Sequence, residues 1–459
     1  MIETNYISFK DPAARVVFEA GKYVRYIFNE YKSEYDHLMS SGLYKQLVDK
    51  NILISHQEIE HSSDKTEVYK LICPDQIPFQ SYPFEWSYTQ WRKAMLSYLR
   101  INKIALRYGM ILKDATPYNF YFKGGQAIMF DTSSFIFFKE NDPWLAYRQF
   151  AEEFLGPIAL MHYSGNHWGR ITISSLRGLP LNFISKQLPL KSWFNITALL
   201  NIHIHARYSQ ESYVVAESQK PSKGFSTDKV QSMLGMIEGT ILRWKSAYQY
   251  AHHWSGYYEN DIESPAYLVH KEEVIRAWLN EIRPKSVLDL GANTGKFSFI
   301  ASEYADNVIS LEYDDSCVDQ IEAHIRKKKI QNVTALAGDL TETTPDLGAL
   351  NKEHRSIFKR GASDMVFGLA LVHHLSIVKN VSFSQIAEMF SMFSKGYAII
   401  EFIPKGDSKV SILLKDKTHE HKEYQETEFI NSLSVYFKIK EVVSLKESLR
   451  KLILLEKLS

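Results

Sequence analysis

The chain has 459 residues, of which 45% are hydrophobic, so it is long enough for two or three domains with real cores. Its 54 basic and 53 acidic residues give a net charge of +1, which excludes a global field that recruits nucleic acid or an anionic membrane; the balance says nothing about local patches. No stretch approaches the roughly eighteen apolar residues of a membrane span. A start without signal-peptide features and only two cysteines, Cys73 and Cys317, predict a cytoplasmic protein with reduced thiols.

The first half of the chain carries a polar constellation after a predicted helix over residues 90–108. Two apolar runs follow that helix, and residues 123–126 are typical of the hairpin turn that joins such runs. Asp114 and Asn119 lie on the first run with the spacing D-x-x-x-x-N, and Asp131 follows the second run. Residue types of this kind at this spacing are able to hold a nucleotide and its metal ion.

This constellation resembles the catalytic loop of kinase-like phosphotransferases, in which an Asp serves as base, an Asn binds metal, and a later Asp holds Mg²⁺. Lys113 and Thr132 replace the flanking residues usual in kinases, and no Gly-rich loop precedes them. The resemblance implies a degenerate kinase-like α+β domain over residues 1–150, with a vestigial nucleotide and Mg²⁺ site at Asp114, Asn119 and Asp131. An active kinase and an unrelated polar loop are the two alternatives.

Residues 151–265 are expected to form a helical extension of the N-terminal domain and a linker. The clearest linker signal is residues 218–226, where Pro, Gly, Ser and Lys interrupt the helical patterns. His203 and His205 would share one face of the chain if their segment were extended. Two histidines without a third ligand are incomplete for zinc, so no metal site is predicted.

The strongest signal in the chain is residues 287–297, V-L-D-L-G-A-N-T-G-K-F, an apolar strand that runs into a glycine-bearing turn and a helix. Gly291 and Gly295 allow the backbone to approach a ligand closely, and the helix start offers unpaired N–H groups. Glu312 ends the next apolar strand, about twenty residues on, where a carboxylate meets ribose hydroxyls in dinucleotide-binding units. Asp289 would lie close to a pyrophosphate on this turn, so it favours a cationic ligand instead.

Further strands and helices follow in alternation. Apolar runs at residues 334–340, 364–375 and 397–402 are separated by helical patterns at 315–329 and 384–393, which predicts a parallel sheet covered on both faces. Asp339 closes the first of these runs. The runs 436–445 and 451–458 are able to close the sheet as an antiparallel hairpin.

The glycine turn resembles motif I of class I S-adenosylmethionine-dependent methyltransferases, E/D-x-G-x-G-x-G, with Asn293 in place of the middle glycine. The resemblance implies an α/β fold with a Rossmann-like, mostly parallel sheet over residues 266–459. It also implies that Asp289 faces the amino group of the methionine moiety, that Glu312 takes the ribose hydroxyls, and that Asp339 meets the adenine amino group. The alternative for Glu312 and Asp339 is that these carboxylates merely cap the next helix.

Two adjacent histidines, His373 and His374, end the fourth predicted strand and are the candidate catalytic residues. If the acceptor is a hydroxyl, one of them would serve as general base. Neighbouring residues on a strand point in opposite directions, so at most one would face the acceptor. The alternative is a buried histidine, or one that packs on the adenine. Glu401, at the end of the fifth strand, would bind acceptor hydroxyls or cap a loop.

Along nearly its whole length the sequence resembles the NoeA-like branch of class I methyltransferases, related to a host-specific nodulation protein. The segments that carry the resemblance are residues 35–44, 81–87, 113–119, 130–132, 146–150, 289–297 and 400–405. It implies methyl transfer from S-adenosyl-L-methionine to a glycan-like or small-molecule acceptor, at oxygen. A bifunctional kinase and methyltransferase, and a cofactor-binding scaffold whose catalytic step has decayed, are the alternatives. No nucleic-acid partner is expected, because neither the charge nor a base-methylating motif supports one.

Overall fold

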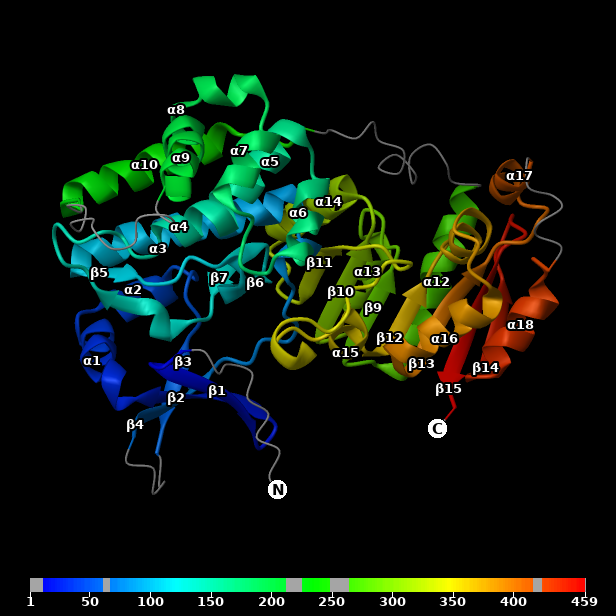
Figure 1. Cartoon of the computed structure of the whole chain (residues 1–459). Coiled ribbons are helices and arrows are strands. Elements are labelled where there is room, and N and C mark those ends of the chain that lie inside the picture. The colour runs from blue at the N-terminus through cyan, green and yellow to red at the C-terminus, as the bar shows by residue number, and fades with distance from the viewer. Residues whose placement is uncertain (1–10, 61–66, 212–224, 248–263, 416–422, 459) are drawn as a thin grey trace. The chain divides into compact units, whose positions relative to one another are not determined.

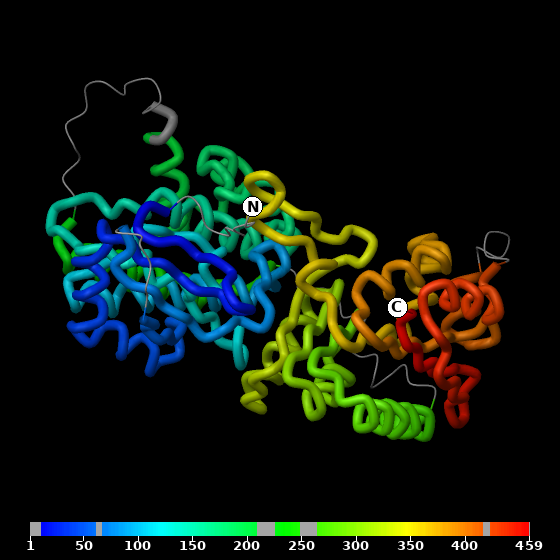
Figure 2. The backbone as a smooth tube through the Cα atoms, turned by 90° about the horizontal axis from the view of Figure 1, so that it is seen from below, coloured from blue at the N-terminus to red at the C-terminus, as the bar shows by residue number. Residues whose placement is uncertain are grey.

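The computed structural model describes residues 11–60, 67–211, 225–247, 264–415 and 423–458, and the chain forms two compact units that can be followed in Figures 1 and 2. Unit 1 comprises residues 1–122, 126–249 and 348–353, and unit 2 comprises residues 123–125, 250–347 and 354–459. Most of the linker predicted at residues 218–226 lies outside the described residues. The predicted domain limits at residues 150 and 265 stay predictions.

Unit 1 begins with a four-stranded antiparallel sheet in the order β1-β2-β4-β3. Its strands are β1 (Ala14–Glu19), β2 (Lys22–Phe28), β3 (His56–Ile59) and β4 (Val68–Pro74), with α1 (Lys32–Ser40) and α2 (Leu43–Asp49) between β2 and β3. Ala20 and Gly21 both have positive φ angles, as a two-residue hairpin turn requires. This turn joins β1 to β2 and brings Arg25, on β2, under the polar constellation of the same unit.

The predicted helix over residues 90–108 is confirmed as α3 (Tyr88–Ala105), followed by a 3-10 turn at Leu106–Tyr108. Ser87 and Gln90 cap its first turn reciprocally. Two short antiparallel pairs come next: β5 (Met110–Leu112) with β8 (Phe135–Phe137), and β6 (Phe120–Lys123) with β7 (Gln126–Met129). The hairpin predicted at residues 123–126 is therefore present.

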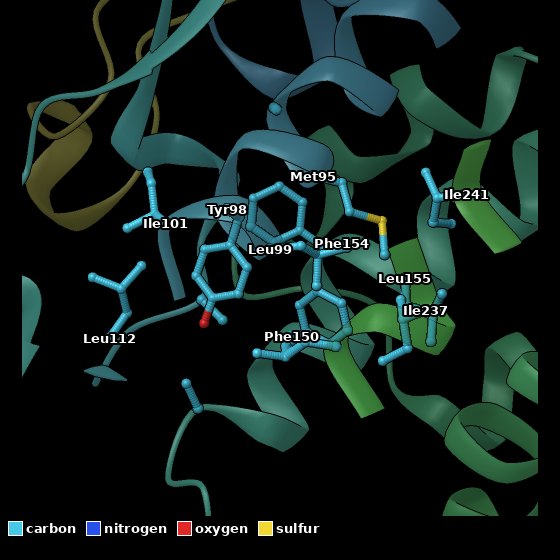
Figure 3. Close-up of a cluster of buried hydrophobic side chains, with 14 of the residues drawn as sticks. Met95, Tyr98, Leu99, Ile101, Leu112, Phe150, Phe154, Leu155, Ile237 and Ile241 are labelled. Atoms are coloured by element: carbon cyan, nitrogen blue, oxygen red, sulfur yellow. The ribbon is translucent and has the colours of Figure 1, made fainter. Parts of the chain in front are cut away.

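The rest of unit 1 is helical and packs on α3. Its helices are α4 (Tyr147–Phe150), α5 (Gly156–Ser164), α6 (His167–Ile171), α7 (Leu181–Gln187), α8 (Ile196–Ala198), α9 (His205–Glu211) and α10 (Thr227–Arg243). Figure 3 shows part of this core, in which side chains of α3 lie near those of α4, of the π-helical turn Ala151–Leu155 and of α10. Tyr98 on α3 stacks on Phe150 and Phe154, with ring centroids 5.6 and 5.3 Å away. These aromatic contacts fix the helices against the segment that carries Asp114.

The segment with His203 and His205 is helical, not extended. Leu199–Ile204 forms a π-helical turn that runs into α9. His203 is buried and its two ring nitrogens lie 2.8 Å from the hydroxyls of Ser185 and Ser192. The two histidines therefore do not share a strand face, because their segment is helical and packs against α7.

Unit 2 is built on a seven-stranded sheet in the order β11-β10-β9-β12-β13-β15-β14. Its strands are β9 (Ser286–Leu290), β10 (Asn307–Glu312), β11 (Val333–Ala337), β12 (Ser363–Gly368), β13 (Ser394–Phe402), β14 (Phe437–Ser444) and β15 (Lys451–Lys457). The first five are parallel, and β15 runs antiparallel to both β13 and β14. The predicted α/β sheet with an antiparallel closing hairpin is present.

Helices cover both faces of this sheet (Figure 1), which explains why its central strands β9, β10 and β12 are mostly apolar and buried. The helices are α12 (Pro265–Ile282), α13 (Lys296–Ser302), α14 (Asp315–Lys328), α15 (Ile357–Gly361), α16 (Phe383–Phe393), α17 (Ser408–Leu414) and α18 (Glu426–Ser434). Side chains of α12, α13 and α14 share a core with Val287 and Phe367. On α16 and α18, Phe383 and Phe429 pack on Phe402 of β13.

The strand order reverses between β9 and β12, because β9 continues to β10 on one side while the chain returns to β12 on the other. Open α/β sheets bind ligands at such a switch point, outside the carboxyl ends of their strands. This is the place to look for a site in unit 2. Among the described residues, no helix combines the length and apolar composition that a bilayer crossing needs.

Candidate functional site

The turn after β9 places its backbone in the left-handed region at three positions. Gly291, Asn293 and Gly295 have φ angles of 72°, 51° and 83°. A Cβ at Gly295 would lie 2.9 Å from Cγ1 of Ile321, and one at Gly291 would lie 3.1 Å from Cδ1 of Leu371. The two glycines are therefore needed both for conformation and for space.

Asn293 fills the position of the usual middle glycine without breaking the turn. Asparagine tolerates the left-handed region better than most residues, because its short amide bonds locally. Its Oδ1 accepts the N–H of Thr294 at 2.7 Å, and its own N–H donates to Oε2 of Glu312 at 2.7 Å. The substitution preserves the turn and ties it to the end of the neighbouring strand.

Asp289 lies near the carboxyl end of the central strand β9 and is only 2% exposed. Burial raises its pKa to about 6, against a hydrogen bond from Ser298 Oγ to Oδ2 (2.6 Å) and the more remote charge of Lys271, both of which lower it. No ion pair to Asp289 is found within the part of the chain that the structure describes. A buried carboxylate of this kind is stabilised by a cationic ligand.

Glu312 ends β10 directly beside β9. Its Oε1 accepts the N–H of Asp314 at 2.9 Å, while Oε2 holds Asn293. Burial raises the pKa of Glu312, although these backbone N–H groups lower it, and the charge of Glu312 in turn raises the pKa of Asp289. Two carboxylates with raised pKa values thus meet at the carboxyl edge of adjacent strands.

Asp339 follows β11 and differs from the other two carboxylates. Burial alone would raise its pKa, but hydrogen bonds from Thr341 and an ion pair with Lys379 outweigh burial and lower it. Lys379 Nζ lies 3.0 Å from Oδ2, and the same ammonium stands 5.5 Å from the ring centroid of Tyr313. Asp339 therefore already has a cation of its own, although that lysine is 44% exposed.

The histidines lie on a helical turn, so the expectation that they alternate on a strand is wrong. β12 ends at Gly368, and the left-handed Ala370 (φ 51°) turns the chain out of the extended conformation before His373. The ring centroids of His373 and His374 lie 4.0 Å apart, with the ring planes tilted by 46°. On a helix, consecutive residues diverge much less than on a strand.

Both histidines are neutral at pH 7. Burial lowers the pKa of His374 to about 4, and burial together with the charges of His374 and Arg450 lowers the pKa of His373 well below its ordinary value. Nδ1 of His373 is buried and has no hydrogen-bond partner among the described residues. An unpartnered buried nitrogen fits a site that receives a hydroxyl.

Unit 2 also contains a buried charge network that its sequence does not predict. Glu401 accepts hydrogen bonds from Tyr267 Oη at 2.5 Å and Lys271 Nζ at 2.6 Å. Arg450 Nε donates to Asp407 at 2.8 Å, and Nη1 donates to Tyr267 Oη at 3.2 Å. Burial would raise the pKa of Glu401, but Lys271 and Arg450 outweigh it and lower it. Glu401 is thus neutralised by Lys271 and Arg450, an arrangement that differs from both of its predicted roles, acceptor binding and loop capping. Local sequence carries no signal for partners so far apart along the chain.

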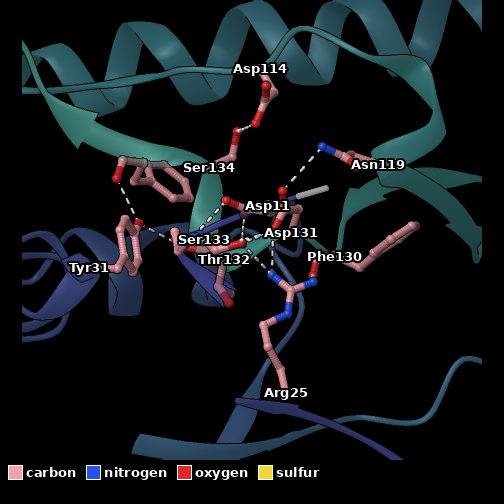
Figure 4. Close-up of polar contacts among 12 residues, drawn as sticks. Asp11, Arg25, Tyr31, Asp114, Asn119, Phe130, Asp131, Thr132, Ser133 and Ser134 are labelled. Atoms are coloured by element: carbon pink, nitrogen blue, oxygen red, sulfur yellow. Dashed lines mark hydrogen bonds and ion pairs between the residues drawn. The ribbon is translucent and has the colours of Figure 1, made fainter. Parts of the chain in front are cut away.

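In unit 1, the structure brings the predicted kinase-like residues Asn119 and Asp131 together (Figure 4). Asn119 Nδ2 donates to Asp131 Oδ2 at 3.4 Å, and Asp114 accepts from Ser134 Oγ at 3.5 Å. Arg25 on β2 forms an ion pair with Oδ1 of Asp131, which also accepts from Ser133. Both oxygens of Asp131 are therefore engaged.

Arg25 sets the pKa of Asp131, and the charge of Asp131 in turn affects the pKa of Asp114. Burial would raise the pKa of Asp131, but the guanidinium outweighs burial and lowers it. Burial and the charge of Asp131 raise the pKa of Asp114 to about 6. Among the described residues, no three His, Cys, Asp or Glu side chains are grouped so that they could hold a metal ion. The guanidinium of Arg25 thus lies against the carboxylate that the kinase-like pattern assigns to Mg²⁺.

Comparison with known proteins gives no matching family model. Among solved structures, the N-methyltransferase NodS from Bradyrhizobium japonicum WM9 is 11% identical, with a TM-score of 0.32, over 43% of this chain and 100% of that one. Magnesium protoporphyrin IX methyltransferase (ChlM) from Synechocystis PCC 6803 with bound SAM is 16% identical, with a TM-score of 0.32, over 44% of this chain and 86% of that one. Both of these structures are named as methyltransferases, and SAM is named for ChlM. Structural similarity at these TM-scores carries no argument about function, which is argued from the residues described above.

A curated relative spans both units. The chain is 26% identical over 441 residues to the nodulation protein NoeA of Rhizobium meliloti (strain 1021), which covers 93% of this chain and 90% of NoeA. The similarity to NoeA does not test the predicted kinase-like domain, which stays a prediction. The resemblance predicted from the sequence is confirmed: this chain is similar to NoeA along nearly its whole length.

Proposed function

We propose that the chain is an S-adenosylmethionine-dependent methyltransferase whose unit 2 binds the cofactor and transfers its methyl group to oxygen of a glycan-like or small-molecule acceptor. The observation that carries the proposal is Asp289, a buried carboxylate with a raised pKa and no ion pair among the described residues, at the switch point of a parallel sheet. A cationic ligand relieves the cost of that buried charge. Glu312 stands beside it on the adjacent strand.

The residues fit the cofactor in the order in which their strands lie. Asp289 on β9 would take the ammonium of the methionine moiety, and Glu312 on β10 would take ribose hydroxyls with the lone pairs left by Asn293 and Asp314. Asp339 after β11 would take the adenine amino group in competition with Lys379. The turn at residues 291–295 brings backbone close without side chains in the way.

When bound, the cofactor supplies a methyl group on a positively charged sulfur, so the protein has mainly to position an acceptor in line with it. The acceptor hydroxyl needs a hydrogen-bond acceptor that is neutral at pH 7. His373 meets this need because its buried Nδ1 has no partner among the described residues. We therefore place His373 ahead of His374 as the group that orients the hydroxyl and receives its proton.

The low pKa of His373 makes it a weak base, so it would hold the proton of the acceptor hydroxyl only during methyl transfer and would then release that proton to water. Lys271 and Arg450, whose charges lower this pKa, belong to the buried network around Glu401. That network is fully paired and is assigned a structural role. The finer parts of the proposal, namely oxygen as the accepting atom, a glycan-like acceptor and a cytoplasmic location with free Cys73 and Cys317, rest on these residues and on the resemblance.

We do not extend the proposal to phosphoryl transfer by unit 1. Asn119 and Asp131 are in contact as the kinase-like pattern expects, which favours a common origin of the loop. Asp131, however, is already neutralised by Arg25 and has both oxygens engaged. As a second candidate function, these contacts support a vestigial nucleotide site at Asp114, Asn119 and Asp131.

The test of the proposed function is a transfer assay with isotope-labelled S-adenosylmethionine and a panel of oligosaccharides, sugar nucleotides and small hydroxylated compounds. Wild-type chain should label at least one acceptor, and His373→Ala should lower kcat by about 100-fold or more while leaving cofactor binding intact. His374→Ala is the matched control. Equal activity of all three chains would remove both histidines from the reaction, and labelling of nitrogen only would refute oxygen as the acceptor atom.

A further inference from the structure

One region of unit 1 has a charge balance unlike the rest of the chain. Residues 154–210, between Glu153 and Glu211, contain no Asp or Glu. The same stretch carries five Lys and Arg side chains: Arg170, Arg177, Lys186, Lys191 and Arg207. The overall charge of +1 conceals this asymmetry, which gives one part of the surface a positive potential.

Most of these cations face solvent without a counter-ion among the residues that the structure describes. Arg177, Lys186, Lys191 and Arg207 are exposed, and none of the four forms an ion pair with a described residue. Glu238, on the neighbouring helix α10, is already paired with Lys103 at 2.7 Å. Glu238 therefore does not cancel the positive charge of this region.

Exposed apolar side chains stand among the cations. In the 3-10 turn Leu190–Phe194, Leu190 is 83% exposed and Phe194 is 93% exposed. Ile196 and Leu200 follow in α8 and in the π-helical turn and are exposed as well. We name Lys186, Leu190, Lys191, Phe194, Ile196 and Leu200 the 186–200 surface. A concentration of large apolar side chains in water is unfavourable unless something covers it.

The 186–200 surface is held out by a rigid support. Ser185 on α7 and Ser192 in the 3-10 turn both hydrogen-bond to the buried ring of His203, each at 2.8 Å. Trp193 stacks on the same ring with centroids 4.1 Å apart. These contacts join α7, the turn and the segment before α9, which Figure 1 shows close together in unit 1. Ser192 and Trp193 are thus fixed on the protein side, while Leu190 and Phe194 are exposed.

We infer that the 186–200 surface docks onto an anionic lipid bilayer, with Leu190 and Phe194 entering the interfacial layer and Lys186 and Lys191 meeting lipid headgroups. Amphipathic elements with apolar tips and flanking lysines bind anionic interfaces in this way. A second copy of the chain would bring one basic face against another. Nucleic acid would match the charge but not the aliphatic tips of Leu190 and Ile196. The inference does not depend on methyl transfer.

The test is co-sedimentation of the full chain with phosphatidylcholine vesicles that contain or lack phosphatidylserine. Wild-type chain should sediment with the anionic vesicles only, and added salt should release it. Lys186→Glu with Lys191→Glu, and separately Leu190→Ser with Phe194→Ser, should each weaken the partition by about tenfold or more. The matched controls change the same residue types elsewhere on unit 1: Lys22→Glu with Lys139→Glu, and Leu145→Ser, which should bind like wild type.

Each other outcome overturns the inference. Failure of folded wild-type chain to sediment with anionic vesicles, or equal binding by the 186–200 variants and their controls, would mean that lipid does not meet this surface. Retention of a single-stranded RNA with the same dependence on Lys186 and Lys191, without vesicle binding, would assign the surface to nucleic acid. A change of oligomeric state on size-exclusion chromatography in Leu190→Ser with Phe194→Ser would assign it to a second copy. Cofactor binding is measured separately, so its failure is not confused with any of these results.

Discussion

Two aspartates at apolar strands, the half-buried Asp131 after β7 in unit 1 and the buried Asp289 on β9 in unit 2, have pKa values shifted in opposite directions. Asp131 has a counter-ion within the chain, Arg25, which lowers its pKa in spite of burial. Asp289 has no such partner among the described residues, and burial raises its pKa to about 6. The sequence pattern marks both residues as ligand-binding, but only Asp289 retains an electrostatic need that a ligand would satisfy.

The same distinction applies to three further carboxylates of unit 2. Glu401 and Asp407 are held by Lys271 and Arg450, and they serve the structure. Asp339 stands between the two classes, since its partner Lys379 is half in solvent. A carboxylate that brings its own buried cation fixes the fold, whereas one that lacks a cation is stabilised when a cationic ligand binds.

The largest expected effect is at Arg25. Arg25→Met removes the ion pair of the half-buried Asp131, so we expect the free energy of unfolding of unit 1 to fall by about 3 kcal/mol. Urea unfolding followed by fluorescence measures it. The double variant Arg25→Met with Asp131→Asn should recover most of the loss. The exposed pair Lys45 and Asp49 supplies the control, since Lys45→Met should cost less than about 1 kcal/mol. A loss at Arg25 no larger than at Lys45 would contradict the structural role.

The second effect has the opposite sign. The pKa of Asp289 is raised from about 3.8 to about 6 in the folded chain, so its contribution to stability is present at low pH and is lost as pH rises through that window. Asp289→Asn removes the buried charge and should raise the free energy of unfolding at pH 7 by up to about 3 kcal/mol, with little gain at pH 4. Urea unfolding at the two pH values tests this. A destabilised variant at pH 7 would show that Asp289 is held by something other than a ligand.

A third prediction concerns the pH dependence of ligand binding. Protonation of Asp289 removes the charge that a ligand ammonium needs, so the affinity for S-adenosylhomocysteine should fall by about tenfold between pH 7 and pH 5. Calorimetric titration at the two pH values measures this ratio. In Asp289→Asn the affinity should be low and nearly independent of pH over the same range. Equal wild-type affinities at both values would exclude Asp289 as the titrating contact.

The smallest effect is at the intermediate carboxylate. Lys379→Met frees Asp339 for the adenine amino group, so we expect binding of S-adenosylhomocysteine to tighten by about two- to fivefold, a change of less than about 1 kcal/mol. Lys405→Met, at an exposed lysine of the same unit, should leave the affinity unchanged. Weaker binding in Lys379→Met would mean that the lysine itself, and not Asp339, contacts the ligand.

The strands and the glycine turn of unit 2 were predictable because their signals are local. Apolar runs of strand length mark β9 to β13, and Gly291 and Gly295 mark the left-handed positions between β9 and α13. The conformation at His373 was predicted wrongly, since the left-handed Ala370 ends the strand early and alanine gives no warning of it. Local periodicity alone does not distinguish a short apolar strand from a helical turn.

Contacts between distant residues were not predictable in the same way. Arg25 lies 106 positions before Asp131, and Lys271 lies 130 positions before Glu401. Nothing near either carboxylate in the sequence indicates which cation reaches it, because the partner is set by the tertiary packing of separate elements. Sequence therefore identified the carboxylates, and the structure identified which of them are already paired.

The most direct test of the distinction between the two aspartates is a calorimetric titration of the full chain with S-adenosylhomocysteine, beside Asp289→Asn and the control Asp306→Asn at the opposite edge of the same sheet. Wild type and Asp306→Asn should bind equally, and Asp289→Asn should lose at least about tenfold in affinity as its charge-assisted contact is lost. Unchanged affinity in folded Asp289→Asn, or no binding by folded wild type, would contradict the assignment of this carboxylate to a cationic cofactor.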